Sequence, residues 1–97
     1  MNAISVTYTD QQLHILIEEY IAMQRSEFTF KSVCSYILYR AMEEGRTANQ
    51  GIYESNQLEA KDCERVCVVL KKILAEGRLN GIDGDVNSMT DNTKFEV

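Results

Sequence analysis

Apolar residues recur at helical spacing in the first quarter of the chain. Within residues 10–24 they lie three and four positions apart, which places them on one face of a helix of about 3.6 residues per turn. Thr9 precedes this segment and Gln12 follows three positions later, the pattern of a capping box in which each side chain bonds the other residue's backbone N–H. We therefore expect an amphipathic helix over residues 10–24. Its expected buried face consists of Leu13, Leu16, Ile17, Tyr20 and Ile21.

A second apolar stripe, from Phe30 to Met42, predicts the next helix. Gly45 marks its end, because glycine readily adopts the left-handed conformation that closes many helices. Immediately before this helix, Phe28-Thr29-Phe30 alternates apolar and polar side chains, which predicts a short strand or an extended entry into the helix. After it, residues 46–55 show no helical period and are expected to form a loop, with a strand-like Ile52-Tyr53.

The third predicted helix covers residues 56–76, with Asn56 and Glu59 as a candidate reciprocal cap and Gly77 as its end. Turn dipeptides follow in residues 79–84, and residues 93–97 alternate as a strand does, so the chain is expected to close as a β-hairpin or a frayed tail. The expected buried face of the helix is Cys63, Val66, Cys67, Leu70, Ile73 and Leu74, and the candidate inward positions of the hairpin are Leu79, Ile82, Phe95 and Val97.

This order of elements resembles the winged helix-turn-helix superfamily, in layout. The resemblance implies an α+β, mainly α, fold: a three-helix winged-helix-like domain with a C-terminal β-hairpin. The alternative is a three-helix bundle with a disordered tail. A chain of 97 residues supports one core, so we expect a single domain over residues 1–97, with an N-terminal arm at 1–8 and a wing or turn at 83–92. The matching segments are residues 9–24, 28–30, 31–44, 56–76, 78–82 and 93–97.

Charge bears on the function that this resemblance implies. In winged-helix proteins the third helix enters the DNA major groove and the wing contacts the backbone. The net charge of −5 disfavours nonspecific attraction to nucleic acid, but residues 46–82 carry six basic against five acidic side chains. By resemblance, Arg65 would read base edges and Lys71, Lys72 and Arg78 would contact phosphates of double-stranded DNA. Against this, the helix is expected to expose three acidic residues, and the wing carries three more. They are Glu59, Asp62 and Glu64, and Asp83, Asp85 and Asp91.

Candidate chemistry elsewhere is sparse. The three cysteines are expected to be reduced and packed in the core, since no CxxC motif is present and the single histidine, His14, is expected on a polar helix face. Residues 83–94 resemble a calcium loop in acidic spacing, but Ser88 replaces its glycine and Lys94 its closing glutamate. No catalytic motif occurs. We therefore expect no enzyme activity, no metal and no cofactor.

Apolar residues outside the helical stripes suggest a second function. Tyr36 and Tyr39 lie off the stripe of the second helix, and Val68, with Val69, lies off that of the third. Exposed aromatic and aliphatic side chains favour protein interfaces, although a small core can also wrap around more of each helix than an ideal stripe covers.

The sequence thus predicts a non-catalytic nucleic-acid-binding or regulatory module of winged-helix type, with double-stranded DNA as partner. The alternative is a protein–protein interaction or dimerisation domain on the same scaffold, working as a homodimer or with a partner protein through Tyr36, Tyr39 and Val68. No apolar run approaches the ~20 residues of a membrane span and the first residues lack a signal-peptide pattern, so we expect no membrane partner and a cytoplasmic location.

Overall fold

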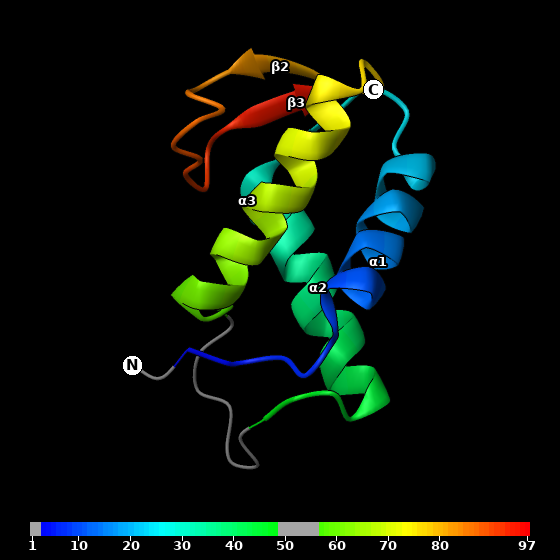
Figure 1. Ribbon diagram of the computed structural model, residues 1–97, viewed down its shortest axis with the longest axis vertical. Coiled ribbons are helices and arrows are strands. Elements are labelled where there is room, and N and C mark those ends of the chain that lie inside the picture. Colours follow the sequence, from blue (N-terminus) through cyan, green and yellow to red (C-terminus); the bar gives the residue numbers. More distant parts are fainter. Residues whose placement is uncertain (1–2, 49–56) are drawn as a thin grey trace.

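The computed structural model describes residues 3–48 and 57–97. Three helices lie side by side, and a small antiparallel sheet covers one end of them (Figure 1). The fold is therefore α+β and mainly α, as expected. The expected strand-like Ile52-Tyr53 and the candidate cap residue Asn56 lie outside the described residues. The elements are α1 (Asp10–Met23), β1 (Glu27–Thr29), α2 (Phe30–Glu44), α3 (Ala60–Ala75), β2 (Asn80–Asp83) and β3 (Lys94–Glu96).

The ends of the first two helices are fixed by local hydrogen bonds. The predicted capping box of α1 is confirmed: the Gln12 backbone N–H donates to Thr9 Oγ1 at 3.1 Å, and the Thr9 backbone N–H donates to Gln12 Oε1 at 2.9 Å. Thr29 and Ser32 form the same arrangement at the start of α2. Gly45 ends α2 with a φ of 70°, a left-handed conformation that costs glycine little.

The start of α3 differs from the prediction. The helix begins at Ala60, and its N-cap residue, Glu59, makes no side-chain capping bond. Instead, the Glu59 backbone N–H donates to the carbonyl oxygen of Ile4 at 2.9 Å. A contact with the N-terminal segment thus replaces the local cap that the sequence suggested.

The C-terminal residues form a hairpin, and its second strand is the middle of the sheet. The strand order is β1-β3-β2, with both pairs antiparallel, and Phe28 lies opposite Phe95. Phe95 is buried, as is Leu79, as predicted. Ile82 and Val97 are 44% and 43% exposed, so their predicted inward orientation is wrong. The register between β2 and β3 shifts between Gly81 and Asp83, which breaks the strict alternation on which the prediction for Ile82 relied.

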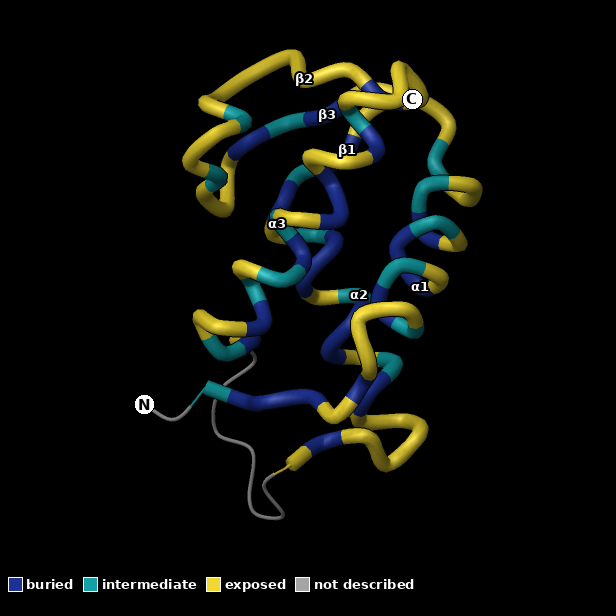
Figure 2. Tube along the Cα trace, in the orientation of Figure 1, coloured by how far each residue is buried: buried dark blue, intermediate teal, exposed yellow. Residues whose placement is uncertain are grey.

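The N-terminal segment, predicted as an arm, packs against the end of the bundle that is opposite the sheet (Figures 1 and 2). Ile4, Val6 and Tyr8 are each at most 5% exposed. Ile4 pairs in parallel with Leu58, and Val6 pairs antiparallel with Thr47. The N-terminal segment therefore lies between Thr47, which follows α2, and Leu58, which precedes α3, and pairs with both.

One hydrophobic cluster draws on all three helices, the sheet and the N-terminal segment (Figure 2). Aromatic rings close it at the sheet end. Phe28 stacks on Phe95 with ring centroids 5.4 Å apart, and Tyr20 meets the edge of Phe28 at the same separation. The expected α3 stripe is confirmed at Val66, Leu70 and Ile73, which are fully buried, whereas Cys63, Cys67 and Leu74 are half-buried at its margin.

Candidate functional site

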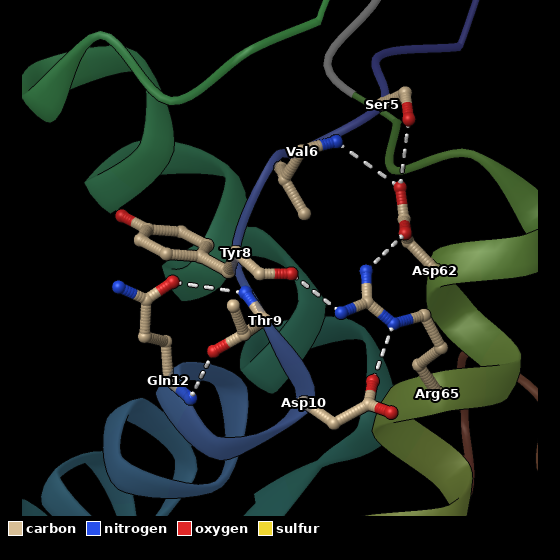
Figure 3. Close-up of polar contacts among 8 residues, drawn as sticks. All are labelled: Ser5, Val6, Tyr8, Thr9, Asp10, Gln12, Asp62 and Arg65. Carbon is tan, nitrogen blue, oxygen red and sulfur yellow. Dashed lines mark hydrogen bonds and ion pairs between the residues drawn. The ribbon is translucent and has the colours of Figure 1, made fainter.

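Arg65, the predicted base-reading residue, is held by groups of its own chain (Figure 3). Its Nε donates to Asp10 Oδ1 at 2.9 Å and its Nη1 to Asp62 Oδ1 at 2.9 Å, while Nη2 donates to the carbonyl oxygen of Tyr8. Its side chain is 29% exposed. Two carboxylates neutralise this guanidinium, which leaves it little freedom to reach a base edge.

Asp62, expected on the exposed face of α3, is fully buried. Its Oδ2 accepts hydrogen bonds from the Val6 backbone N–H at 3.1 Å and from Ser5 Oγ at 3.2 Å, and its Oδ1 accepts one from Arg65 (Figure 3). The prediction was wrong because the N-terminal segment covers this part of α3. The carboxylate is a structural connection between that segment and the helix.

Arg78, a predicted phosphate contact, is also paired within the chain. Its Nη1 donates to Glu18 Oε2 on α1 at 2.8 Å, and its Nη2 donates to Glu76 Oε1 at 2.8 Å. The bond to Glu18 is the main cause that raises the pKa of the Arg78 guanidinium, and the bond to Glu76 is the second. The bond from Arg78 in turn lowers the pKa of Glu76. The side chain is about half exposed, so phosphate would have to compete with both carboxylates.

The remaining predicted cations lie on the exposed face of α3. Lys71 and Lys72 are exposed, and among the described residues neither forms an ion pair, although Lys71 Nζ donates to the carbonyl oxygen of Asn87 at 3.3 Å. Val68 projects between them and Glu64, with 67% of its surface exposed. We call this face the α3 ridge; it consists of Lys61, Glu64, Val68, Lys71, Lys72 and Ala75.

A groove runs along each side of the α3 ridge, and Val68 lines both. The α1–α3 groove, of about 600 Å³, is lined on the α1 side by Gln11, His14 and Ile15. Ile15 is 50% exposed there, next to the side of Val68. On the other side, the hairpin groove, of about 420 Å³, lies between α3 and the loop that joins β2 to β3. Its lining includes Glu64, Cys67, Lys71, Asn87, Ser88 and Met89.

Sequence reasoning missed Ile15 and misplaced Val69. Ile15 is a single apolar residue between polar positions of the outer α1 face, and that isolation was the available signal. Val69, expected beside Val68 outside the stripe, is only 7% exposed and belongs to the core. α1 packs beside α3 (Figure 1), and Val69 belongs to the hydrophobic cluster whereas Val68 stays outside it.

The two tyrosines predicted for an interface have different environments. Tyr36 is half-buried, its ring lies 5.2 Å from that of Tyr20, and its hydroxyl accepts a hydrogen bond from Arg40 Nη1 at 2.8 Å. Tyr39 is 61% exposed on the outer side of α2. Of the three predicted interface residues, therefore, Tyr39 and Val68 are exposed on the surface and Tyr36 contributes mainly to packing.

The loop of the hairpin, predicted as a wing, is exposed and acidic. Asp83, Asp85 and Asp91 are all exposed, and Asp85 accepts a hydrogen bond from the Asn87 backbone N–H at 2.9 Å, which shapes the turn. Lys94 follows at the margin of the sheet. Three carboxylates would face a DNA backbone that approached this loop, and like charges repel.

The thiols form a neighbouring pair between α2 and α3. Cys63 Sγ donates to the carbonyl oxygen of Leu58 at 3.6 Å. The neighbouring Cys63 thiol and burial raise the pKa of Cys34, and the interaction with Cys34 lowers the pKa of Cys63. All three cysteines are free. Over residues 3–48 and 57–97, no group of three histidine, cysteine or acidic side chains is placed to hold a metal ion, and no helix there has the length and apolar character needed to cross a membrane.

Comparison of the chain with protein-family models, with curated proteins and with solved structures gave no match.

Proposed function

We propose that this chain is a non-catalytic protein-interaction domain on a winged-helix-like scaffold, and that its contact surface is the α3 ridge with the two grooves beside it. The support for the scaffold is the element order and the sheet order β1-β3-β2. A cytoplasmic location belongs to the same proposal, since three free thiols suit a reducing compartment.

The observation that carries this proposal is the exposure of Val68 between two grooves. An aliphatic side chain that is 67% exposed, with Ile15 at 50% across one groove, forms an apolar centre within a charged rim. Protein interfaces have this arrangement, with an apolar anchor surrounded by polar groups that exclude water. Apolar anchors contribute little to a contact with phosphates.

The competing function, binding of double-stranded DNA, has less support from the charges. Two of the four predicted cations, Arg65 and Arg78, are each paired with two carboxylates. The acidic loop lies beside Lys71 in the hairpin groove. Lys61, Lys71 and Lys72 remain available on the α3 ridge, and they are the residues through which DNA would have to bind.

Site-specific photo-crosslinking tests the proposal. A photoreactive amino acid is placed at position 68 in one variant and at position 39 in another, and cells that produce the protein are irradiated. We expect a discrete protein adduct from position 68 alone. An adduct from position 39 alone would move the interface to α2 and contradict the proposal.

Nuclease treatment and a DNA titration separate the two functions. If the adduct from position 68 disappears on nuclease digestion, its partner is nucleic acid and the protein-interaction proposal is wrong. The same conclusion would follow if fluorescence anisotropy with duplex DNA showed binding that weakens with salt and is lost when Lys71→Glu is combined with Lys72→Glu. We expect no measurable binding of DNA at low ionic strength.

A further inference from the structure

We propose that the partner is a second copy of this chain, which packs its α3 antiparallel to the first α3 about a twofold axis at Val68. This inference rests on the proposed function, because it uses the same surface. Twofold dimers join the same patch on both copies, so the patch must be complementary to itself.

The spacing of charges along α3 provides that complementarity. Glu64 lies four positions before Val68 and Lys72 four positions after it. At about 100° per residue, they lie on opposite sides of the Val68 direction at equal angles and equal distances along the axis. A twofold axis that runs between the two antiparallel helices at Val68 inverts the order of residues along them. It therefore brings Glu64 of the second copy to the height of Lys72 of the first, and Lys72 of the second to the height of Glu64 of the first, across the Val68 contact.

Both charges are available for this contact. Glu64 and Lys72 are exposed, and neither forms an ion pair within residues 3–48 and 57–97. The rotation also brings Arg65 to the height of Lys71 of the other copy, so that two like charges lie across the contact from each other. Asp10 and Asp62 already neutralise that guanidinium, which reduces the repulsion.

The same rotation keeps each groove on its own side of Val68. The α1–α3 groove of one copy therefore faces the α1–α3 groove of the other, and the hairpin groove faces the hairpin groove. The exposed Ile15 of both copies then lies on the same side of the contact, next to the two Val68 side chains. This side adds apolar surface to the contact at Val68.

Sedimentation equilibrium of the full chain tests self-association. We expect the mass to rise with concentration from 11.1 kDa to twice that value. Val68→Asp should weaken the dimer about hundredfold, because it places two carboxylates face to face on the axis. Tyr39→Asp, an equally exposed change on α2, should leave the association constant unchanged. A wild-type chain that stays monomeric at millimolar concentration would overturn the inference.

Charge reversal tests the antiparallel arrangement. Glu64→Lys alone and Lys72→Glu alone should each weaken the homodimer about tenfold, since each change creates two contacts between like charges. An equimolar mixture of the two variants should recover dimers of wild-type affinity, because every pair in the mixed dimer is then of opposite charge. Helical circular dichroism of each variant verifies that the exposed changes leave the fold intact.

Three results would contradict the proposal in different ways. Failure of the mixture to associate would rule out the twofold axis at Val68, even if the single variants dissociate. A crosslinked adduct at position 68 with a mass other than twice the chain would keep the protein-interaction function and reject the second copy as partner. Absence of any protein adduct there would reject the proposed function itself.

Discussion

At the scale of single residues, the most consequential group is the buried carboxylate of Asp62. It accepts hydrogen bonds from Ser5, Val6 and Arg65, which come from two segments far apart in the sequence. A buried charge is tolerated only when such partners replace water. No periodicity argument could identify this role, because the sequence around Asp62 resembles any charged helix face, and two of its partners, Ser5 and Val6, are more than fifty positions away.

Replacement of Asp62 should therefore be costly. We expect Asp62→Ala to lower the free energy of unfolding by about 3 kcal/mol, since it leaves the Arg65 guanidinium and the Val6 N–H without their acceptor. Asp10→Ala removes the exposed partner of the same arginine and should cost less than about 1 kcal/mol. Urea denaturation of both variants measures the difference. Equal losses would mean that burial of Asp62 does not matter to stability.

A second prediction concerns Glu44. Its Oε1 accepts a hydrogen bond from the Tyr8 hydroxyl at 2.6 Å, and its Oε2 contacts Arg40 Nη2 at 2.7 Å. The bond from Tyr8 is the main cause that lowers the pKa of Glu44, and the bond from Arg40 is the second. A carboxyl with a lowered folded-state pKa stabilises the fold above its unfolded value of about 4.3, and that contribution is lost as the pH falls through the folded value.

Removal of the Tyr8 hydroxyl should reduce this effect. We expect Tyr8→Phe to raise the pKa of Glu44 toward its ordinary value, as followed by carbon NMR of the side-chain carboxyl. Tyr36→Phe is the matched control, because the Tyr36 hydroxyl bonds Arg40 and not Glu44. The expectation fails if the two variants shift the Glu44 titration equally.

At the scale of secondary-structure elements, the helices follow from local patterns and their surroundings do not. The stripe of α1, its capping box and the glycine that ends α2 depend on residues within a few positions of one another, so the sequence suffices to predict them. The exposure of Ile15 and Val68 and the burial of Val69 depend on how far α1 covers α3. That extent is set by the packing of whole elements and cannot be calculated from the helical period of one segment. The sequence therefore suggested Val68 as exposed but did not reveal the exposure of Ile15.

The helix caps make a prediction at this scale. Thr29 ends β1 and caps α2 with its side chain, whereas the side chain of Glu59 at the start of α3 makes no capping bond. We expect Thr29→Ala to cost about 1 kcal/mol of unfolding free energy and Thr29→Ser to cost much less, because serine keeps the acceptor oxygen. Glu59→Ala should be nearly neutral. Thermal denaturation of the three variants measures this, and a Glu59→Ala loss as large as that of Thr29→Ala would contradict it.

At the scale of the whole molecule, the two ends of the helical bundle are closed by different segments. The sheet covers one end, and residues 4–8 cover the other (Figure 1). Alternation and turn residues predicted the hairpin, with a frayed tail as the alternative, but not the pairing of β1 with β3. The N-terminal closure was not predicted, because the short stretch from Ile4 to Tyr8 has too few residues to show that its two β-bridges are made with residues beyond α2.

Matched isoleucines measure the contribution of the N-terminal segment. Ile4 is 1% exposed and Ile82 is 44% exposed. We expect Ile4→Ala to lower the free energy of unfolding by about 3 kcal/mol through lost burial and the cavity left behind, and Ile82→Ala to change it by less than about 0.5 kcal/mol. Chemical denaturation compares them. If Ile4→Ala were as mild as Ile82→Ala, residues 4–8 would not belong to the cooperative unit.

The position of β3 has a consequence for synthesis on the ribosome. Among the strands of residues 3–48 and 57–97, β1, which ends at Thr29, pairs with β3 alone, and β3 begins at Lys94 and lies between the other two strands. At a translation rate of about 10 residues per second, the edge strand leaves the exit tunnel several seconds before the strand that satisfies its hydrogen bonds. The nascent chain can form its helices during that interval, while Phe28 of β1 lacks its stacking partner Phe95 until β3 has emerged.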